Sequence, residues 1–497
     1  MSSNLSSGTA HGATACRLIA YQLFASLYAS LFLRYFKPWR KTISRRPIPH
    51  SRSKPIDFFL IASNRRSSAM AETHKVVILG GGFGGLAAAL KLKNAPVQVT
   101  LIDRCNYHLF QPLLYQVATG SLSPANVAGP LRQVLRKQKN TQVLLGEAVS
   151  IDTAKRQVML SDGIVDYDTL IVATGSTHQY FGHDEWEEFA PGLKNLNDAT
   201  AMRGRILLAF EAAERERDPE KLRAWMTFVI VGAGPTGAEL AGALGEIAHD
   251  TLKHDFRDID PASARIVLVE GADRPLPSYP QNLSDAARKM LNNLGVTVRT
   301  NTMVTDITAE GVTIKEGGRT ETIPTRTVLW AAGVLASPLG KILSENAGAP
   351  LDNASRVVVQ PDMTVPGHPE IFVIGDLSNF SHQTGKPLPG VAQPAMQQGD
   401  YVAKLIRARF RGQKLPPFHY FDKGNLATIG RGAAVADLNW LQISGFPAWL
   451  MWIFVHLVYI IQFQNRLLVM MQWAWLYLTF DRSARLITGK SPLPLDL

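Results

Sequence analysis

Residues 76–85 of this 497-residue chain read VVILGGGFGG, a short apolar run that leads directly into glycines. The run predicts a buried strand, and the spacing Gly80-x-Gly82-x-x-Gly85 predicts a tight turn that opens a helix. In such a turn the first glycine permits the bend, the second lets the backbone approach a pyrophosphate, and the third allows close packing of the helix. The pyrophosphate would lie against the positive end of the helix. The stretch therefore predicts a dinucleotide site, with Asp103, at the end of the next expected strand, accepting from a ribose.

A second copy of this pattern, FVIVGAGPTG, ends at Gly237 and has the same spacing through Gly232 and Gly234. Its next strand is expected to end at Glu270, whose carboxylate would bond an adenosine ribose and repel a 2′-phosphate. Two like charges about 4 Å apart repel by roughly 1 to 4 kcal/mol at effective dielectric constants of 80 to 20. The second site therefore favours NADH over NADPH, although Arg274 lies nearby in sequence. We interpret the two patterns as unlike sites, one for a resident flavin and one for a visiting nicotinamide.

Three further segments are typical of apolar strands that end in a tight turn. They are DTLIVATG at 168–175, TVLWAAG at 327–333 and IFVIGD at 371–376. The last ends in Asp376, a carboxylate that could reach the polyol between an isoalloxazine ring and its phosphate. Each segment alone is more typical of an ordinary strand with a tight turn at its end. Together with the alternation of strands and helices they predict an α/β fold with parallel sheets.

The charge distribution gives little support to a nucleic-acid-binding function. The net charge is +11, but the residues before Met70 contain 11 basic residues and one acidic residue, which leaves 41 basic against 40 acidic residues in the rest of the chain. The body of the protein is therefore nearly neutral. The only cysteines, Cys16 and Cys105, form no CxxC motif, and the histidines show no metal-ligand spacing, so we expect no metal.

The basic segment at residues 1–69 is open to three interpretations. It is rich in arginine and serine and contains an apolar run from Leu18 to Leu33. It is typical of a mitochondrial-type transit peptide, of a signal-anchor, or of an extension translated from a start codon placed too far upstream. Met70 would be a natural start, because a first strand usually begins within a few residues of the terminus in this kind of fold.

Four segments outside the glycine turns resemble the type II (non-proton-pumping) NADH:quinone oxidoreductases. They are NYHLFQPLLYQVATG at 106–120, AQPAMQQG at 392–399, DKGNLATIGR at 422–431 and VHLVYIIQFQNRLLVMMQWAWLYLT at 455–479. The resemblance covers roughly 75–489. It implies two Rossmann-like dinucleotide-binding domains, for FAD and NADH, and a C-terminal membrane-associating helical segment. The expected layout is an FAD-binding domain at 75–205 and 330–415, an NADH-binding domain at 206–329, and a membrane-docking region at 416–497. Residues 1–74 form a basic N-terminal extension that has no counterpart in the family.

The resemblance also implies the residues that bind the two nucleotides. Non-covalent FAD would be held by Gly80, Gly82, Gly85, Asp103, Ala173, Thr174, Gly175, Gly375 and Asp376. NADH, as the substrate, would be held by Gly232, Gly234, Gly237 and Glu270.

Four further residues are implied in the reaction itself. Glu239 would face the nicotinamide and the flavin, although an acid near a helix N-terminus is also simply stabilising. Gln393 and Gln397 lie four apart, on one face of an expected helix, where neutral amides could donate to a quinone. Exposed helical glutamines are also common. Lys423 would lie near the isoalloxazine and stabilise its reduced anion, or it is an ordinary surface lysine.

The expected reaction is hydride transfer from NADH to FAD followed by delivery of two electrons to a membrane quinone, without proton pumping, as part of a respiratory chain. One alternative is a sulfide:quinone oxidoreductase, which needs paired redox cysteines that this sequence lacks. Another is a flavin-binding NADH sensor. The partners we expect are a quinone, the surface of a lipid bilayer and a second copy of the chain.

The C-terminal region is the expected point of membrane contact. Residues 446–463 contain no Lys, Arg, Asp or Glu, and after QNR at 464–466 the apolar run resumes to Phe480. Its tryptophans and tyrosines suit one or two helices in the membrane interface, while a spanning helix and a buried helix remain alternatives. We expect the protein to be membrane-associated and to face the cytoplasm at a bacterial inner membrane. If residues 1–69 target an organelle, the expected location is the mitochondrial inner membrane.

Overall fold

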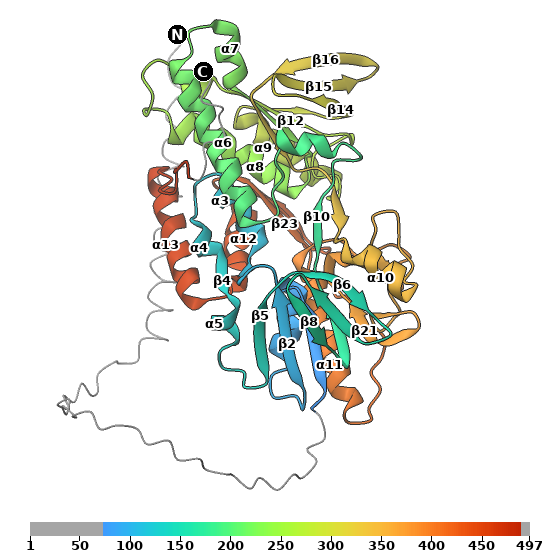
Figure 1. Ribbon diagram of the computed structural model, residues 1–497. Helices are drawn as coiled ribbons and strands as arrows, with labels where there is room; N and C mark the ends of the chain where they lie inside the picture. Colours follow the sequence, from blue (N-terminus) through green and yellow to red (C-terminus); the bar gives the residue numbers. More distant parts are fainter. Residues whose placement is uncertain (1–72, 489–497) are drawn as a thin grey trace, which may run out of the picture. The chain divides into compact units, whose positions relative to one another are not determined.

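The computed structural model describes residues 73–488 (Figure 1). All of these residues fall within one compact unit. The three interpretations of residues 1–69 concern residues that lie outside the described part of the chain.

The larger sheet has six strands in the order β20-β21-β9-β1-β2-β5. Its members are β1 (Lys75–Leu79), β2 (Gln98–Asp103), β5 (Thr141–Leu145), β9 (Thr169–Val172), β20 (Thr364–Val365) and β21 (His368–Val373). All neighbours run parallel except β20 and β21. The buried residues of β1 and β9 are continuous apolar runs, as expected for parallel strands that are covered on both faces. One part of this sheet precedes the second sheet in the chain and the other part follows it.

The second sheet is fully parallel, in the order β13-β12-β11-β17. Its members are β11 (Thr227–Val231), β12 (Arg265–Val269), β13 (Val296–Arg299) and β17 (Thr327–Trp330). The α/β fold with two parallel sheets is therefore confirmed. β17 ends one residue beyond the limit expected for the NADH-binding domain, and the domain limits themselves stay a prediction.

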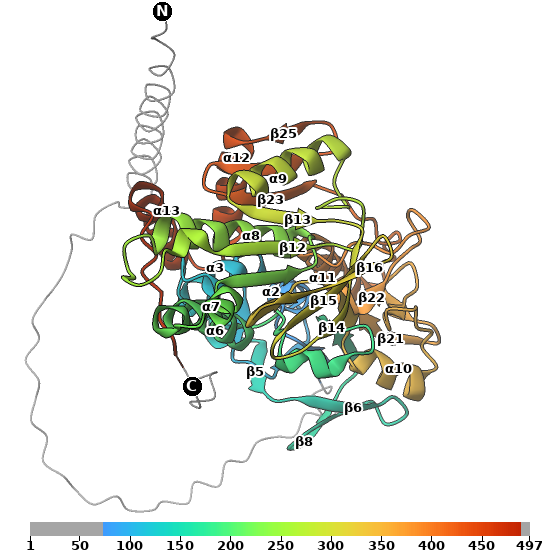
Figure 2. The ribbon, with the colours of Figure 1, turned by 90° about the horizontal axis from the view of Figure 1, so that it is seen from above.

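Three small antiparallel sheets accompany the parallel ones (Figure 2). They are β6 (Ala148–Asp152), β7 (Gln157–Leu160) and β8 (Gly163–Asp166); β14 (Thr302–Ile307), β15 (Gly311–Glu316) and β16 (Arg319–Pro324); and β23 (Asn425–Gly430), β24 (Ala433–Asp437) and β25 (Gln442–Ser444). Short two-stranded pairs join β3 (Tyr107–Leu109) to β4 (Ala128–Pro130), β10 (Ser176–His178) to β18 (Val334–Ala336), and β19 (Val357–Val358) to β22 (Ser378–Asn379).

Helices cover the sheets and carry the candidate residues Glu239, Gln393 and Gln397. They are α2 (Phe83–Lys91), α3 (Leu114–Ala118), α4 (Pro124–Val127), α5 (Leu131–Leu135), α6 (Leu196–Arg215), α7 (Pro219–Trp225), α8 (Pro235–Glu246), α9 (Gln281–Asn293), α10 (Leu339–Ala347) and α11 (Ala392–Arg409). α11 packs along α2, the helix that follows the first glycine turn. α8, which follows the second glycine turn, packs against β23. The helix contacts therefore join each glycine turn to a segment from the last quarter of the chain.

Two helices, α12 (Phe446–Tyr459) and α13 (Phe463–Thr479), form the C-terminal apolar region. The break between them is at 460–462, and not at the polar triplet 464–466, which lies inside α13. The Arg466 guanidinium donates to the carbonyl of Ile460 at 2.7 Å and so closes the turn. Within residues 73–488 no helix combines the length and the apolarity needed to cross a bilayer.

Candidate active site

The first glycine turn has the geometry of a pyrophosphate cradle. Gly80 has a φ of +99°, which only glycine adopts readily, and a Cβ on Gly85 would lie 1.9 Å from the carbonyl oxygen of Gly80. A Cβ on Gly82 would meet nothing within 4 Å, so its face is open to a ligand. Asp103, at the end of β2, accepts from the backbone N–H of Gly81 at 2.5 Å and of Cys105 at 2.6 Å. Burial raises the pKa of Asp103, and these two N–H groups oppose that rise.

The second glycine turn repeats this construction. Gly232 has a φ of +96°, a Cβ on Gly237 would lie 1.8 Å from the Gly232 carbonyl oxygen, and Gly234 again faces open space. Glu270 follows β12 directly and accepts from the N–H of Ala233 at 2.6 Å and of Ala272 at 2.9 Å. Both turns therefore fit a dinucleotide, and both have an acid fixed to the glycine loop.

The strand ends beside the first turn also fit a polar ligand. The Thr174 hydroxyl is buried without a hydrogen-bond partner, and Gly175, with a φ of +71°, faces open space. Asp376 follows β21 and accepts from the Ser176 hydroxyl at 2.8 Å. Gly375, with a φ of +73°, makes the turn that precedes it. Ala173 bonds back to β1 through its N–H, to the carbonyl of Leu79 at 2.8 Å.

Two residues at this position have no counterpart among the sequence predictions. Lys194 Nζ donates to the Ser176 hydroxyl at 3.0 Å. Burial lowers the pKa of Lys194, and the charge of Asp376 offsets only part of this decrease. Gln398 is 1% exposed and its side-chain oxygen accepts from the Gly375 N–H at 2.6 Å, which fixes the turn. Lys194 lies 18 positions from Ser176 and Gln398 lies 23 positions from Gly375, and neither interval is a helix or strand period, so no local pattern indicates these contacts.

Glu239 lies in α8, one turn after the second glycine turn, and is 9% exposed. Its carboxylate accepts a long bond of 3.4 Å from the N–H of Thr428 in β23. Burial raises its pKa to about 8. Thr428 opposes this rise, as does the nearby indole of Trp452, whose N–H makes no hydrogen bond of good geometry. Near neutral pH this carboxyl group therefore holds a proton.

Gln393 and Gln397 share one face of α11 as expected, and both bind the segment that carries Lys423. The Gln397 amide pairs with the backbone of Phe421 in both directions, at 2.9 and 3.0 Å. The Gln393 nitrogen donates to the Gly424 carbonyl at 2.9 Å, while its oxygen is buried and unpartnered. Gln397 therefore holds the backbone of Phe421 in place, and the side-chain oxygen of Gln393 remains free to accept a hydrogen bond.

Lys423 lies beside the end of α12. Its Nζ contacts the Tyr459 hydroxyl at 3.1 Å and lies 5.8 Å from the centre of that ring. No hydrogen bond among the described residues joins Glu239 to Lys423, Gln393 or Gln397. The structure therefore brings the two glutamines and the lysine together through 421–424, and through Thr428 it brings Glu239 to β23, the strand that follows this segment.

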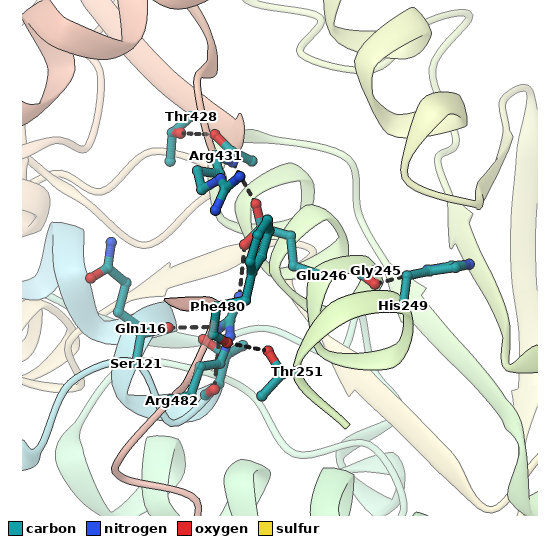
Figure 3. A network of polar contacts seen from close by, with 12 residues as sticks. Gln116, Ser121, Gly245, Glu246, His249, Thr251, Thr428, Arg431, Phe480 and Arg482 are labelled. Atoms are coloured by element: carbon teal, nitrogen blue, oxygen red, sulfur yellow. Dashed lines mark hydrogen bonds and ion pairs between the residues drawn. The ribbon is translucent and has the colours of Figure 1, made fainter. Parts of the chain in front are cut away.

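A buried ion pair lies two turns further along α8 (Figure 3). Glu246 binds the Arg482 guanidinium at 2.7 Å and accepts from the Arg431 N–H at 2.5 Å. Arg482 is 2% exposed and also donates to the Ser121 hydroxyl at 2.7 Å. These residues and Glu239 line a cavity of about 80 Å³ between α8, β23, α12 and α13. Sequence analysis missed the pair, because Glu246 and Arg482 are 236 positions apart.

The chemistry of paired cysteines is not favoured. Cys105 is the one cysteine within residues 73–488, and it is free. In the same part of the chain no group of three or more His, Cys, Asp or Glu residues is placed to hold a metal ion.

Comparisons with known proteins agree with the geometry. Residues 74–399 match the family model of the pyridine nucleotide-disulphide oxidoreductases, and residues 423–482 match that of the NDH2 C-terminal domain. A type II NADH:quinone oxidoreductase, Ndh of Mycobacterium tuberculosis, is 46% identical over 84% of this chain and 91% of its own. The type II NADH:quinone oxidoreductase of Staphylococcus haemolyticus is 31% identical over 75% of this chain and 92% of its own.

Solved structures show the same fold. NDH2 from Plasmodium falciparum, in complex with NADH, superposes with a TM-score of 0.76 at 22% identity, over 84% of this chain and all of its own. The sulfide:quinone oxidoreductase of Aquifex aeolicus superposes less closely, with a TM-score of 0.62 at 18% identity, over 84% of this chain and 93% of its own. The fold, the two nucleotide cradles and the close relatives together show that this chain belongs to the type II NADH:quinone oxidoreductase family of the pyridine nucleotide-disulphide oxidoreductases.

Proposed function

We propose that this protein oxidises NADH and reduces a membrane quinone, using non-covalently bound FAD and without pumping protons. The observation that carries the proposal is the presence of two equally built nucleotide cradles in one chain. The 46% identical relative named as a type II NADH:quinone oxidoreductase supports the same activity.

The first cradle is proposed to hold FAD. Gly80, Gly82 and Gly85 would admit its pyrophosphate and Asp103 its ribose, while Ala173, Thr174, Gly175, Gly375 and Asp376 would line the rest. FAD would accept a hydride from NADH and release two electrons to the quinone. We assign 75–205 and 330–415 to the domain that holds it, 206–329 to the NADH-binding domain, and 416–497 to membrane docking.

The second cradle is proposed to hold NADH. Gly232, Gly234 and Gly237 would receive its pyrophosphate, with Glu270 at the adenosine ribose. The Arg274 guanidinium is directed to its own loop, where it donates to the Pro277 carbonyl at 3.3 Å and lies 3.5 Å from Asp273. This placement leaves the Glu270 carboxylate to disfavour a 2′-phosphate.

Residues of α8, α11 and the 421–424 segment are proposed to serve the reacting groups. Glu239 is a buried carboxyl that can hold or release a proton near pH 8. Gln393 would orient the quinone, with Gln397 holding 421–424 in place behind it. Lys423 would supply positive charge where negative charge develops.

The quinone is proposed to reach the protein from a bilayer against α12 and α13. These helices bury one face on the body through Trp449, Trp452, Val469 and Trp473. Their other face exposes apolar side chains, namely Phe454 61%, Val458 48%, Phe463 52%, Met471 54%, Trp475 59% and Leu478 60%. An exposed apolar face of this kind, rich in aromatic rings, suits docking into a membrane interface.

Location and assembly are part of the same proposal. We place the protein at the cytoplasmic face of a bacterial inner membrane, or at a mitochondrial inner membrane if residues 1–69 are a transit peptide, and we propose a homodimer. Mass spectrometry of the mature N-terminus tests the first assignment, and sedimentation velocity of the detergent-solubilised protein tests the second.

The activity is tested on the purified protein. We expect a yellow preparation whose flavin absorbance is bleached by NADH and restored by a quinone. NADH oxidation that is unaffected by added quinone would instead indicate the sensor function, and a colourless protein would refute the proposal.

A further inference from the structure

Two acids share one face of α8, Glu239, which is 9% exposed, and Glu246, whose side chain is 15% exposed. Glu239 and Glu246 are seven residues apart, which is two helical turns and about 10.5 Å along the axis. Each accepts from a backbone N–H of the β23 segment, Glu239 from Thr428 at 3.4 Å and Glu246 from Arg431 at 2.5 Å. Between them a Cβ on Gly242 would lie 1.6 Å from the Ile429 carbonyl oxygen, so helix and strand are in backbone contact. The relative positions of the two acids are therefore fixed.

The space between the acids is suited to water. It is the cavity of about 80 Å³ lined by both carboxyl groups, whereas one water needs roughly 10–15 Å³ by this measure. Two donors that line it, Trp452 Nε1 and Arg482 Nε, make no hydrogen bond of good geometry, and both residues are 2% exposed. Buried donors of this kind are normally satisfied, by ordered water where no protein acceptor is present.

Arg482 also lines a second, outer space. This is a surface groove of about 570 Å³ that includes the four carboxylates of Glu211, Glu214, Asp255 and Asp481. Arg482 thus lines both the acidic groove and the cavity that reaches Glu239, and Glu246 lines the cavity beside it.

The reaction requires a proton from solution. NADH, one proton and a quinone give NAD⁺ and a quinol, since the hydride supplies two electrons and only one of the two hydrogens. We propose that Glu246 is a proton-relay residue, which passes this proton from the acidic groove through cavity water to Glu239. This inference rests on the proposed function.

The groups that face the relay define its charge balance. Around Glu246 they are Arg482 from the C-terminal segment, Arg431 after β23, Asp250 beyond α8 and Tyr115 of α3. Around Glu239 they are Tyr115 and Tyr279, while His456 stacks on Trp452 and stays neutral because burial lowers its pKa to about 4. The positive charge of Arg482 stabilises the ionised form of Glu246, so that this carboxylate can accept a proton inside the protein.

Two variants of the FAD-loaded enzyme test the relay. Glu246→Gln removes the proton carrier, and Ala243→Leu fills the cavity with a side chain but leaves both acids in place. For each we expect quinone reduction to fall about tenfold and to decline more steeply with rising pH. The rate at which NADH bleaches the flavin absorbance should not change. Glu345→Gln, which removes an exposed carboxylate of α10 that lines neither the cavity nor the groove, should behave like the unmodified protein.

A second measurement needs no turnover. The protonated Glu239 carboxyl, identified as the infrared C=O band that Glu239→Gln removes, should exchange with D₂O about tenfold more slowly in both variants. Unchanged exchange and unchanged quinone reduction in Ala243→Leu would overturn the relay even if Glu246→Gln failed to fold. Failure of the unmodified enzyme to reduce quinone would instead refute the proposed function.

Discussion

At the scale of single residues, the glycines of each turn have separate tasks. Gly85 and Gly237 are glycines because a side chain would collide with the turn itself, whereas Gly82 and Gly234 face open space. Gly82 also has a φ of −68°, which alanine adopts without strain. Folding therefore does not require glycine at the middle position, and only a ligand gives a reason for it.

This difference predicts that Gly82→Ala folds normally but binds FAD weakly. The added methyl group would occupy the space proposed for the pyrophosphate, so we expect at least a tenfold loss of FAD affinity with little change in the thermal unfolding of the apoprotein. Titration with FAD and differential scanning fluorimetry measure the two effects. Gly85→Ala is the contrasting variant and should lower the unfolding temperature. Wild-type affinity in Gly82→Ala would place the pyrophosphate elsewhere.

The Glu239 carboxyl makes stability depend on pH. Its pKa is about 8 in the folded protein against 4.5 for an unperturbed glutamate, so the folded state binds more protons between these values. Stability should therefore fall as the pH rises from about 4.5 to 8, and each pKa unit contributes about 1.4 kcal/mol. Glu239→Gln should remove this loss, up to roughly 5 kcal/mol in total. Denaturant unfolding at pH 5 and pH 9 tests this, and equal pH dependence in both proteins would contradict it.

Glu270 should set the choice between NADH and NADPH. Because a like charge about 4 Å away costs roughly 1 to 4 kcal/mol, Glu270→Gln should reduce the preference for NADH at least about fivefold. The measurement is the ratio of kcat/KM for the two nucleotides. Asp285→Asn removes an exposed carboxylate of α9 and serves as the control. An unchanged ratio in Glu270→Gln would remove its assigned role.

At the scale of elements, α12 and α13 are each divided between two environments. Trp473 is buried in α13 and donates to the Gln116 side chain at 2.7 Å, while Trp475, two residues away, is 59% exposed. Asn465 donates to the Ala125 and Ala128 carbonyls at 3.1 and 3.3 Å and so fixes the start of α13 on the body. The exposed apolar side chains of α13 are therefore fixed in position relative to the body of the protein.

This arrangement predicts that polarity on the outer face of α13 weakens membrane binding. Met471→Gln replaces an exposed apolar side chain by a polar one of similar shape and should lower binding to phospholipid vesicles about tenfold, since burying such a side chain contributes about 1.5 to 3 kcal/mol. Co-sedimentation with vesicles measures it. Met303→Gln, in β14, changes an equally exposed methionine and should have no effect. Equal effects of the two variants would show that α13 is not the docking face.

At the scale of the whole molecule, the predictable features are the local ones. Each glycine turn has the same internal spacing, an acid ends or directly follows the next strand, and β1 contains the whole of the predicted apolar run. The break at 460–462 was not predicted, because it depends on the Arg466 side chain bonding back to Ile460. Lys194, Gln398 and the Glu246–Arg482 pair were missed for a related reason: each meets its partner, 18, 23 and 236 positions away, only through tertiary packing. No spacing in the sequence encodes that packing.

Asp103 accepts a hydrogen bond from the N–H of Gly81, and Glu270 accepts one from the N–H of Ala233. These two bonds affect how strongly the nucleotides bind. Each carboxylate holds its glycine loop in the conformation that would bind a pyrophosphate, and it does so through protein groups alone. The loop is therefore preorganised. Little conformational entropy then has to be given up on association, and more of the contact energy is available as affinity. Both loops therefore have their binding conformation before a dinucleotide arrives, and binding requires little rearrangement of the backbone.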